Sequence, residues 1–454
     1  MTNNQNSKNI AVVGLGYVGL PLALLADKKG HNVIGIDQDK RKVMLINEHI
    51  PPFTDEKITN LLRESCIEAT TEWERIQETS VVIVCVPTPV NSNHMPDLEP
   101  LKNAVEFIAQ HIQKKHLVII ESTINPGVCE GVIVPILESI SGMTAGIDFY
   151  LAHCPERINP GDKKWNVENI PRVVGSLEST GLKKAITFYK SIISGEVKAM
   201  KSIKEAEAVK IIENSFRDVN IAFVNELAQS FSHLGIDVEN VIEGASTKPF
   251  AFMAHHPSCG VGGHCIPVDP YYLIDYAKRN GYNHRFLSLA REINNEMPKF
   301  TVNLVEELLD EIEMPIKGTK ITVLGLAYKP NVDDCRESPA LEIIKELEEL
   351  GANVVTYDPH VKNKSTAQTL EEAVENAYVV VVATAHDEFK KITPQFLIDH
   401  NTSSLVDGQN CLREQEFIDA GIMYEGIGKH YNYHKQHENS QIQAVSSADI
   451  EHSY

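Results

Sequence analysis

A short apolar run that ends in a glycine pattern, close to the start of the chain, restricts the possible folds more than any other feature. Residues 9–13 are Asn-Ile-Ala-Val-Val, and Gly14, Gly16 and Gly19 follow with the spacing GxGxxG before an Ala- and Leu-rich stretch. In a strand–turn–helix unit the first glycine makes a tight turn, the second admits a pyrophosphate close to the backbone, and the third lets the helix pack on the strand. The pattern therefore predicts a dinucleotide-binding turn.

An acidic residue at the end of the next strand indicates which dinucleotide is bound. Residues 33–36 form a mostly apolar run that ends at Asp37, about twenty residues after the glycines. A carboxylate there accepts hydrogen bonds from ribose hydroxyls and repels a 2′-phosphate, so NAD is favoured over NADP. The basic residues 40–42 keep NADP open as an alternative. A turn of the same shape without a nucleotide is the other alternative.

Short apolar runs alternate with helical stretches in both halves of the chain, which is typical of an α/β fold with parallel sheets. The predicted strands are residues 9–13, 33–36, 81–86, 117–120, 150–153, 320–327, 354–358, 379–383 and 404–407. Only the first half contains GxGxxG. We therefore expect two Rossmann-like, doubly wound parallel-sheet domains, with a dinucleotide in the first.

The middle of the chain has helical periodicity over residues 205–234 and 283–309. Lys210 and Asn214 stand at i and i+4, so they share one face of the first helix. A long helix pair between two α/β units commonly forms a subunit interface, so we expect a homodimer or a higher homo-oligomer. The predicted domains are 1–204 (dinucleotide-binding), 205–315 (central helical and dimerisation region), 316–430 (second Rossmann-like domain) and 431–454 (disordered tail).

The central region also contains a cysteine directly after a glycine-rich stretch. Gly260, Gly262 and Gly263 precede Cys265, and Asp269 follows four residues later. Glycines allow a positive φ or a close backbone approach. A thiolate on such a loop is a strong nucleophile when its pKa is lowered. The alternative is a cysteine that acts as a small buried hydrophobe.

Polar residues follow three of the predicted strands in the first half. Thr88, Thr123 and Glu156 each stand in a loop after an apolar run. Ligands bind at the carboxyl ends of parallel strands, so these side chains are expected to meet in one crevice. Each of them taken singly is also typical of a turn or a helix cap.

Composition excludes several classes of function. The formal net charge of −20 argues against a nucleic-acid partner, because phosphate binding needs a basic surface. No apolar run is long enough for a membrane span, and the N-terminus lacks the apolar core of a signal peptide. The eight cysteines are scattered without a CxxC pair or zinc-like spacing, so we expect cytoplasmic thiols and no metal.

Motifs along nearly the whole chain resemble those of the UDP-glucose/GDP-mannose dehydrogenase family. They are Gly14-Leu-Gly-Tyr-Val-Gly-Leu-Pro21, Val86-Pro-Thr-Pro89, Glu121-Ser-Thr123, Cys154-Pro-Glu-Arg-Ile-Asn-Pro-Gly161, Gly262-Gly-His-Cys265 with Asp269, and Gly325-Leu-Ala-Tyr-Lys329 through Arg336-Glu-Ser338. His264, Pro155-Glu-Arg157 and the segment 213–220 resemble the UDP-N-acetylhexosamine branch. Ser246-Thr-Lys-Pro-Phe250 is most similar to UDP-N-acetylglucosamine 6-dehydrogenases.

The resemblance implies a four-electron oxidation that converts the C6 alcohol of a UDP-sugar to a carboxylate and reduces two NAD⁺. Cys265 would hold the aldehyde as a thiohemiacetal and then as a thioester, which water hydrolyses. Lys210 and Asn214 would stabilise the oxyanions. The remaining catalytic roles, in proton transfer and in holding water, fall to Glu156, Asp269 and Thr123.

The resemblance also implies two sets of binding residues. The coenzyme contacts are Gly14, Gly16, Tyr17, Val18, Gly19, Asp37, Lys42, Thr88, Thr123 and Arg336. The substrate contacts are Glu156, Arg157, Lys210, Asn214, Lys248, Gly262 and Lys329, the last in the domain that would bind UDP. One departure is that Gln409-Asn410 stands where many relatives carry a substrate arginine. Arg413 lies nearby but is not aligned with that position.

Several alternatives differ in the substrate or in the need for the cysteine. The leading substrate is UDP-N-acetylglucosamine, and the alternatives are UDP-N-acetylmannosamine, UDP-N-acetylgalactosamine and UDP-glucose. A single-step, two-electron dehydrogenase would not need Cys265. An inactive NAD-binding regulatory protein is the alternative without catalysis. The expected product is a sugar acid for surface polysaccharide synthesis.

Overall fold

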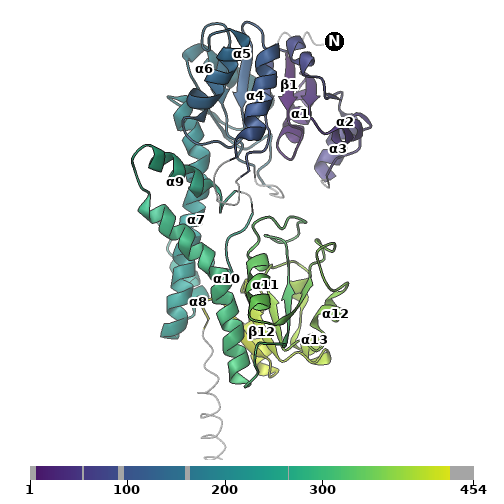
Figure 1. Ribbon diagram of the computed structural model, residues 1–454, viewed down its shortest axis with the longest axis vertical. Helices are drawn as coiled ribbons and strands as arrows, with labels where there is room; N and C mark the ends of the chain where they lie inside the picture. The colour runs from purple at the N-terminus through teal and green to yellow at the C-terminus, as the bar shows by residue number, and fades with distance from the viewer. Residues whose placement is uncertain (1–6, 54–55, 90–96, 159–163, 264, 430–454) are drawn as a thin grey trace, which may run out of the picture. The chain divides into compact units, whose positions relative to one another are not determined.

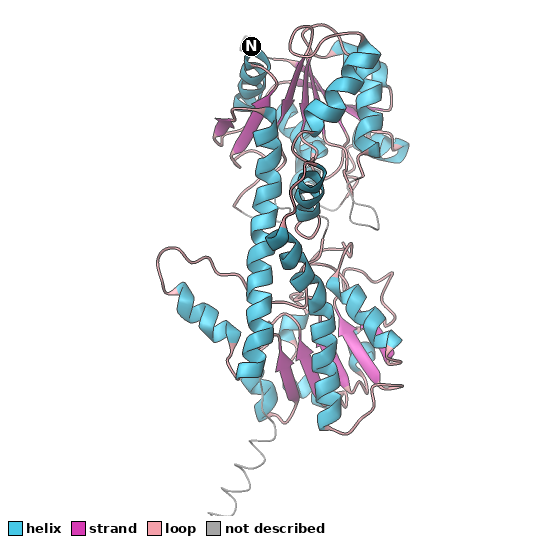
Figure 2. Ribbon diagram, turned by 60° about the vertical axis from the view of Figure 1, so that its left-hand side comes forward, coloured by secondary structure: helices cyan, strands magenta, loops and turns pink. Residues whose placement is uncertain are grey.

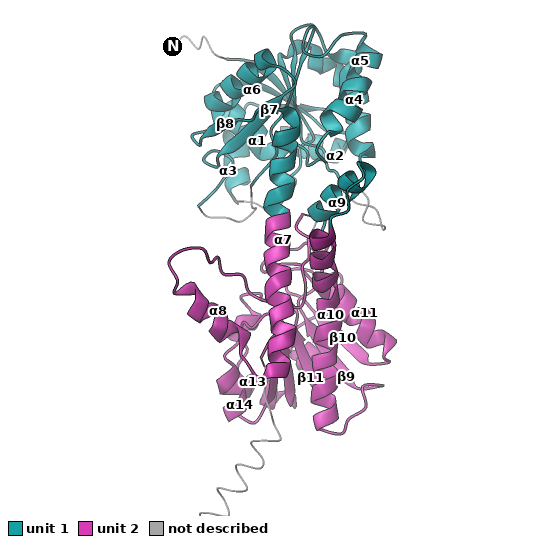
Figure 3. Cartoon of the chain, turned by 90° about the vertical axis from the view of Figure 1, so that its left-hand side faces the viewer, with its two compact units in different colours: residues 1–214, 268–284 teal, residues 215–267, 285–454 magenta. Residues whose placement is uncertain are grey.

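The computed structural model describes residues 7–53, 56–89, 97–158, 164–263 and 265–429 (Figures 1 and 2). These residues form two compact units. Of the described residues, the first contains those up to 214 and those at 268–284, and the second contains those at 215–267 and from 285 onward (Figure 3). The boundary falls inside the helix α7 (Ile203–Leu234) and directly after the cysteine loop. The separate central region expected for residues 205–315 stays a prediction.

The first unit contains an eight-stranded sheet with the order β3-β2-β1-β4-β5-β6-β7-β8. Its strands are β1 (Asn9–Val13), β2 (Asn32–Ile36), β3 (Glu68–Thr70), β4 (Val81–Val84), β5 (Leu117–Ile120), β6 (Tyr150–His153), β7 (Arg172–Ser176) and β8 (Val197–Ala199). All neighbouring strands are parallel except β6 and β7, which pair antiparallel. The helices of this unit are α1 (Gly19–Lys28), α2 (Lys40–Asn47), α3 (Glu56–Glu64), α4 (Glu99–His111), α5 (Val134–Ser141), α6 (Ser179–Ile192), α9 (Asp269–Arg279) and the first part of α7.

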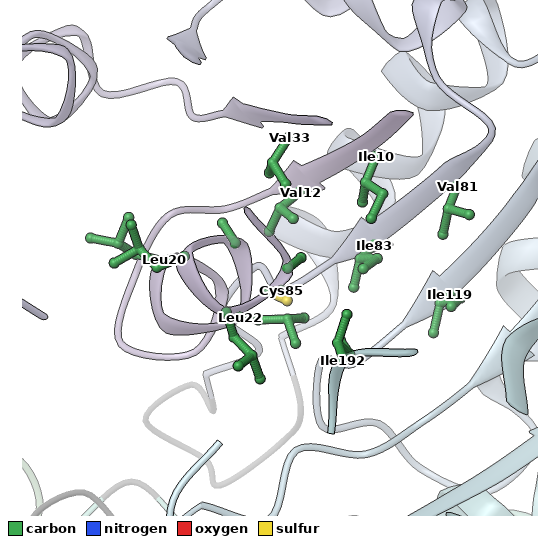
Figure 4. Packing of buried hydrophobic residues seen from close by; sticks show 14 of the residues in the cluster. Ile10, Val12, Leu20, Leu22, Val33, Val81, Ile83, Cys85, Ile119 and Ile192 are labelled. Atoms are coloured by element: carbon green, nitrogen blue, oxygen red, sulfur yellow. The ribbon is translucent and has the colours of Figure 1, made fainter. Parts of the chain in front are cut away.

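The central strands β1, β4 and β5 of this sheet are apolar on both faces because each face is covered. In β1, Ile10 and Val12 pack into one buried cluster (Figure 4), and Ala11 and Val13 pack into another. Successive side chains of a strand point to opposite faces, so a strand that is buried on both sides must be apolar throughout. This is the reason why the sheet is recognisable in the sequence as continuous apolar runs.

The second unit contains a five-stranded parallel sheet with the order β10-β9-β11-β12-β13. Its strands are β9 (Lys320–Leu324), β10 (Asn353–Tyr357), β11 (Val379–Val382), β12 (Ser404–Asp407) and β13 (Met423–Gly426). Its helices are α8 (Val238–Ser246), α10 (Arg285–Glu311), α11 (Pro339–Glu349), α12 (Leu370–Val374), α13 (Pro394–Asp399), α14 (Glu414–Asp419) and the rest of α7. The predicted fold class, with two Rossmann-like sheets and long central helices, is confirmed. His264 and the predicted tail at residues 431–454 lie outside the described residues.

The turn after β9 is closed by an acid of the neighbouring strand. Asp358 follows β10, and its Oδ2 accepts hydrogen bonds from the backbone N–H groups of Leu326 (2.7 Å) and Ala327 (2.9 Å). The ring Nε2 of His386 lies 3.1 Å from the same oxygen. Burial alone would raise the pKa of Asp358, but these hydrogen bonds bring it down to about 2.

Candidate active site

Each glycine of the first turn meets a different steric requirement. Gly14 has φ +90°, and a Cβ there would lie 2.9 Å from the carbonyl oxygen of Cys85. A Cβ on Gly19 would lie 1.9 Å from the carbonyl oxygen of Gly14, so only glycine lets α1 begin this close to the strand. A Cβ on Gly16 would have no atom within 4 Å. The space beside Gly16 suits a ligand that approaches the backbone, as the sequence predicts.

Replacing Gly16 with alanine should weaken NAD binding by at least about tenfold and leave the thermal midpoint of the coenzyme-free protein unchanged. The new methyl group meets no protein atom within 4 Å, but it would fill the space where we expect the pyrophosphate to approach the backbone. Calorimetric titration with NAD and a thermal melt measure the two quantities. Gly131→Ala is the matched control, because a Cβ there also meets nothing within 4 Å. Unchanged NAD affinity in Gly16→Ala would contradict the assignment.

The turn is bordered by a charged pair and by the start of a helix. Asp37 is 7% exposed, accepts a hydrogen bond from the Leu15 N–H (2.8 Å), and binds Lys42 Nζ at 2.7 Å. Tyr17 is exposed, with its ring centroid 4.2 Å from that of Phe53. Val18, the residue before α1, provides no side-chain cap among the described residues. The first N–H groups of α1 can therefore bind a phosphate, so the residues present fit a dinucleotide.

The strand-end residues of the first unit are tied together by hydrogen bonds. Thr88 Oγ1 donates to the carbonyl oxygen of Thr123 at 2.7 Å, and Tyr272 of α9 donates its hydroxyl to the carbonyl oxygen of Thr88 at 2.6 Å. The Glu156 N–H, after β6, donates to the carbonyl oxygen of Glu121 at 3.4 Å. The ends of β4, β5 and β6 therefore meet at one edge of the sheet.

Three of the predicted catalytic residues, the buried Asn214 and Asp269 and the half-buried Lys210, interact within the first unit. Asn214 Nδ2 donates to Asp269 Oδ2 at 2.5 Å, joining α7 to the first residue of α9. Asp269 is 2% exposed, and burial raises its pKa to about 6, although the charge of Lys210 and the hydrogen bond from Asn214 oppose the shift. A carboxylate with this pKa can exchange a proton near neutral pH.

Two acids on the same helix were not predicted as site residues. Glu207 is fully buried and accepts hydrogen bonds from the N–H groups of Gly127 (2.5 Å) and Cys129 (2.8 Å), which fixes the loop after β5. Glu213 accepts two hydrogen bonds from Arg157, one of them from Nε at 3.1 Å. Arg157 is thus held by α7, and its contact with substrate stays a prediction. The signal in the sequence is the helical spacing of these acids around Lys210.

The cysteine loop lies in the second unit, packed against the loop that follows β9. The Gly263 N–H donates to the carbonyl oxygen of Arg336 at 3.1 Å, and Gly263 has φ +89°. A Cβ on Gly262 would lie 2.7 Å from the carbonyl oxygen of Glu337, and one on Gly263 would lie 2.6 Å from the Tyr328 ring. These glycines are therefore required by packing within the protein. The sequence alone allowed either a positive φ or a close approach to a ligand.

Two cationic side chains of this unit, Lys329 and Arg336, interact electrostatically with the half-buried Cys265. Burial lowers the pKa of Lys329, and the charges of Asp334 and Cys265 oppose that shift. Arg336 is bound by Asp334, with Nη2 and Oδ2 2.6 Å apart, and Cys265 also contributes to raising its pKa. The structure thus brings Cys265, Lys329 and Arg336 into one electrostatic neighbourhood, where a thiolate would be stabilised.

Other predicted residues have partners elsewhere in the second unit. Lys248 is exposed, with Nζ 5.0 Å from the centre of the Phe250 ring. Gln409 Nε2 donates to the carbonyl oxygen of Ala383 at 2.9 Å. Arg413 is exposed and pairs with Glu416 at 3.0 Å. Within the described residues, no group of three or more His, Cys, Asp or Glu side chains could hold a metal ion, and no helix could cross a membrane.

Comparison with known proteins gives matches over most of the chain. Three models of the UDP-glucose/GDP-mannose dehydrogenase family match: the NAD binding domain at residues 8–193, the central domain at 204–296 and the UDP binding domain at 322–414. A UDP-N-acetyl-D-mannosamine dehydrogenase of Pyrococcus horikoshii is 37% identical over 427 residues, covering 92% of this chain and 99% of its own. A UDP-N-acetyl-D-glucosamine 6-dehydrogenase of Pseudomonas aeruginosa is 37% identical over 389 residues, covering 84% and 92%. The solved structure of a UDP-D-ManNAc dehydrogenase from Pyrococcus horikoshii has a TM-score of 0.87 at 36% identity, covering 93% and 99%.

Proposed function

Because the chain belongs to the UDP-glucose/GDP-mannose dehydrogenase family, we propose that it oxidises C6 of a UDP-N-acetylhexosamine to the carboxylate in two NAD-dependent steps. The chain is an NAD-dependent UDP-sugar dehydrogenase. The named sugars of its relatives support the N-acetylhexosamine. The oxidation to the acid is supported by the buried pair of Asn214 and Asp269 together with the charge of the half-buried Lys210, because a base and two hydrogen-bond donors suit the hydrolysis of a thioester.

Bound NAD⁺ supplies the hydride acceptor for both oxidation steps. In the first step the C6 hydroxyl loses its proton to a base, for which Glu156 or Asp269 is a candidate, and C6 becomes an aldehyde. The Cys265 thiolate then adds to the aldehyde carbon, and Lys210 and Asn214 donate hydrogen bonds to the resulting oxyanion. Loss of the second hydride leaves a thioester on Cys265. Water held by Thr123 and activated by Asp269 cleaves the C–S bond, which returns the thiolate and yields the acid.

The sugar is proposed from the sequence, with UDP-N-acetylglucosamine as the first candidate. The segment at residues 246–250 favours it. The relatives do not separate the epimers, because a mannosamine enzyme and a glucosamine enzyme are each 37% identical to this chain. UDP-N-acetylmannosamine, UDP-N-acetylgalactosamine and UDP-glucose therefore stay in the comparison as alternatives.

A panel of these four UDP-sugars, each incubated with NAD and in parallel with NADP, should give two NADH for each molecule of UDP-N-acetylglucosamine oxidised. Two coenzymes are required because an alcohol loses four electrons on the way to a carboxylate. NADH absorbance and mass spectrometry of the sugar product measure this ratio. One NADH per sugar would indicate the single-step dehydrogenase, and turnover of UDP-glucose alone would contradict the N-acetylated substrate. No turnover of any sugar would favour the regulatory protein.

We also propose that the chain forms a homodimer through its central helices. The support is a set of exposed apolar side chains on the parts of α7 and α10 that belong to the second unit. They are Phe216 (49% exposed), Phe223 (54%), Phe286 (68%) and Leu289 (50%). Apolar side chains exposed on neighbouring helices are typical of a subunit interface.

A further inference from the structure

A chain of buried hydrogen bonds joins the two long helices of the second unit, which lie side by side there (Figure 3). Asp218 of α7 accepts hydrogen bonds from Arg291 Nη1 (2.5 Å) and Asn294 Nδ2 (2.8 Å), both on α10. Asn294 Oδ1 in turn accepts from Asn225 Nδ2 at 2.9 Å. These four residues are at most 4% exposed. Each hydrogen bond therefore satisfies a group that water does not reach.

The same chain of hydrogen bonds reaches the backbone ahead of the predicted nucleophile. Asn225 Oδ1 accepts from the Ser258 N–H at 3.0 Å, and Ser258 Oγ donates to the carbonyl oxygen of Gly260 at 2.9 Å. Asn225 is fully buried and uses its amide nitrogen toward one helix and its amide oxygen toward the loop. Only one orientation of the amide allows both contacts, so the position of Asn294 and the position of the loop depend on each other.

The loop is held at two further points that are close to Cys265 in sequence. The Cys259 N–H donates to the carbonyl oxygen of Gly408 at 2.9 Å, and the Gly263 N–H donates to that of Arg336 at 3.1 Å. These two hydrogen bonds fix the backbone at residues 259 and 263. Asn225 fixes the backbone at Ser258, where the loop begins. A side chain that must meet a substrate carbon within a fraction of an ångström needs such a supported backbone.

We propose that Asn225 and Asn294 are positioning residues that fix the cysteine loop for the steps in which Cys265 reacts. Hydrogen bonds of these two amides connect the Asp218–Arg291 pair on the helices to the backbone of Ser258. This role rests on the proposed function, since it takes Cys265 as the nucleophile.

The kinetic test compares Asn225→Ala, Asn294→Ala and the double variant with Thr301→Val. Thr301 is a matched control because it is fully buried on α10 and, within the part of the chain that the structure describes, its hydroxyl bonds only to the Met297 carbonyl of its own helix. Each Asn variant should lower kcat at least about tenfold and leave the KM for NAD within about twofold, because a displaced loop affects the reacting group and not the coenzyme turn. The double variant should be no slower than the slower single variant, since the amides act in series. Thr301→Val should keep the wild-type kcat.

A second measurement does not depend on sugar oxidation. The rate at which iodoacetamide alkylates Cys265, followed by peptide mass spectrometry on the full chain, should change at least about threefold in both Asn variants and stay unchanged in Thr301→Val. If the wild type oxidises no UDP-sugar but the alkylation rate changes in this way, the proposed function fails, and what stands is that the two amides hold the loop that carries Cys265. If the Asn variants match Thr301→Val in kcat and in alkylation rate, the positioning role is overturned.

Discussion

Replacing Cys265 with alanine should lower the rate of sugar acid formation by at least about a thousandfold. Without the thiol the aldehyde has no covalent attachment, so neither the thiohemiacetal nor the thioester can form. NAD binding should persist, because the coenzyme turn and Asp37 belong to the first unit and Cys265 belongs to the second. Product formation by mass spectrometry and NAD affinity by calorimetry measure the two effects.

The control for this substitution is Cys66→Ala, which removes an exposed thiol of the first unit. It should keep the wild-type rate. Hydroxylamine added to the Cys265→Ala reaction should trap any free aldehyde as an oxime, which shows how far the first oxidation proceeds. A Cys265→Ala protein that forms the acid at the wild-type rate would overturn the covalent route.

Replacing Asp269 with asparagine should lower kcat by at least about a hundredfold and remove the acidic limb of its pH profile. The pKa of Asp269 is raised to about 6 by burial, and a base must be deprotonated to accept a proton. In the wild type, activity should therefore be full above this value and fall as the pH drops through about 6. Rate measurements from pH 5 to 9 at saturating substrate would test this expectation.

A substitution at Lys210 tests the direction in which this residue shifts the pKa of Asp269. Lys210 lowers the pKa of Asp269, so Lys210→Met should move the acidic limb to higher pH as well as reduce the rate. Asp275→Asn is the matched control, since Asp275 is a carboxylate of the same helix that pairs with Arg279 at 2.9 Å. If the limb near pH 6 is the same in Asp269→Asn as in the wild type, another group is the base.

The sequence is most informative where local chemistry decides the structure. The apolar runs at residues 117–120 and 404–407 predict strands, and β5 and β12 have these bounds. The periodic stretch at residues 205–234 predicts a long helix, and α7 covers Ile203–Leu234. A strand buried on both faces, or a long helix without proline, leaves a direct signal in the order of the residues.

Contacts between residues that are far apart in the sequence leave no such signal in the order of the residues. Nothing in the sequence indicates that β7 pairs antiparallel with β6, or that Asp269 meets Asn214. The amides of Asn225 and Asn294 are 69 positions apart, and their role follows only from the packing of two helices. For the glycines of the cysteine loop, the sequence left open a positive φ or a close backbone approach, and it did not reveal that a Cβ on Gly262 would meet the loop after β9.

The acid that closes the turn after β9 limits how this chain could be redesigned. In the first unit, Asp37 binds one turn N–H and Lys42, and it remains a reasonable hydrogen-bond acceptor for a ribose. Its counterpart Asp358 is saturated, since it accepts from the N–H groups of Leu326 and Ala327 and is next to the His386 ring. Adding glycines to the second turn would therefore not create a second coenzyme site. An engineer would first have to remove a carboxylate that already occupies the N–H groups a phosphate would need.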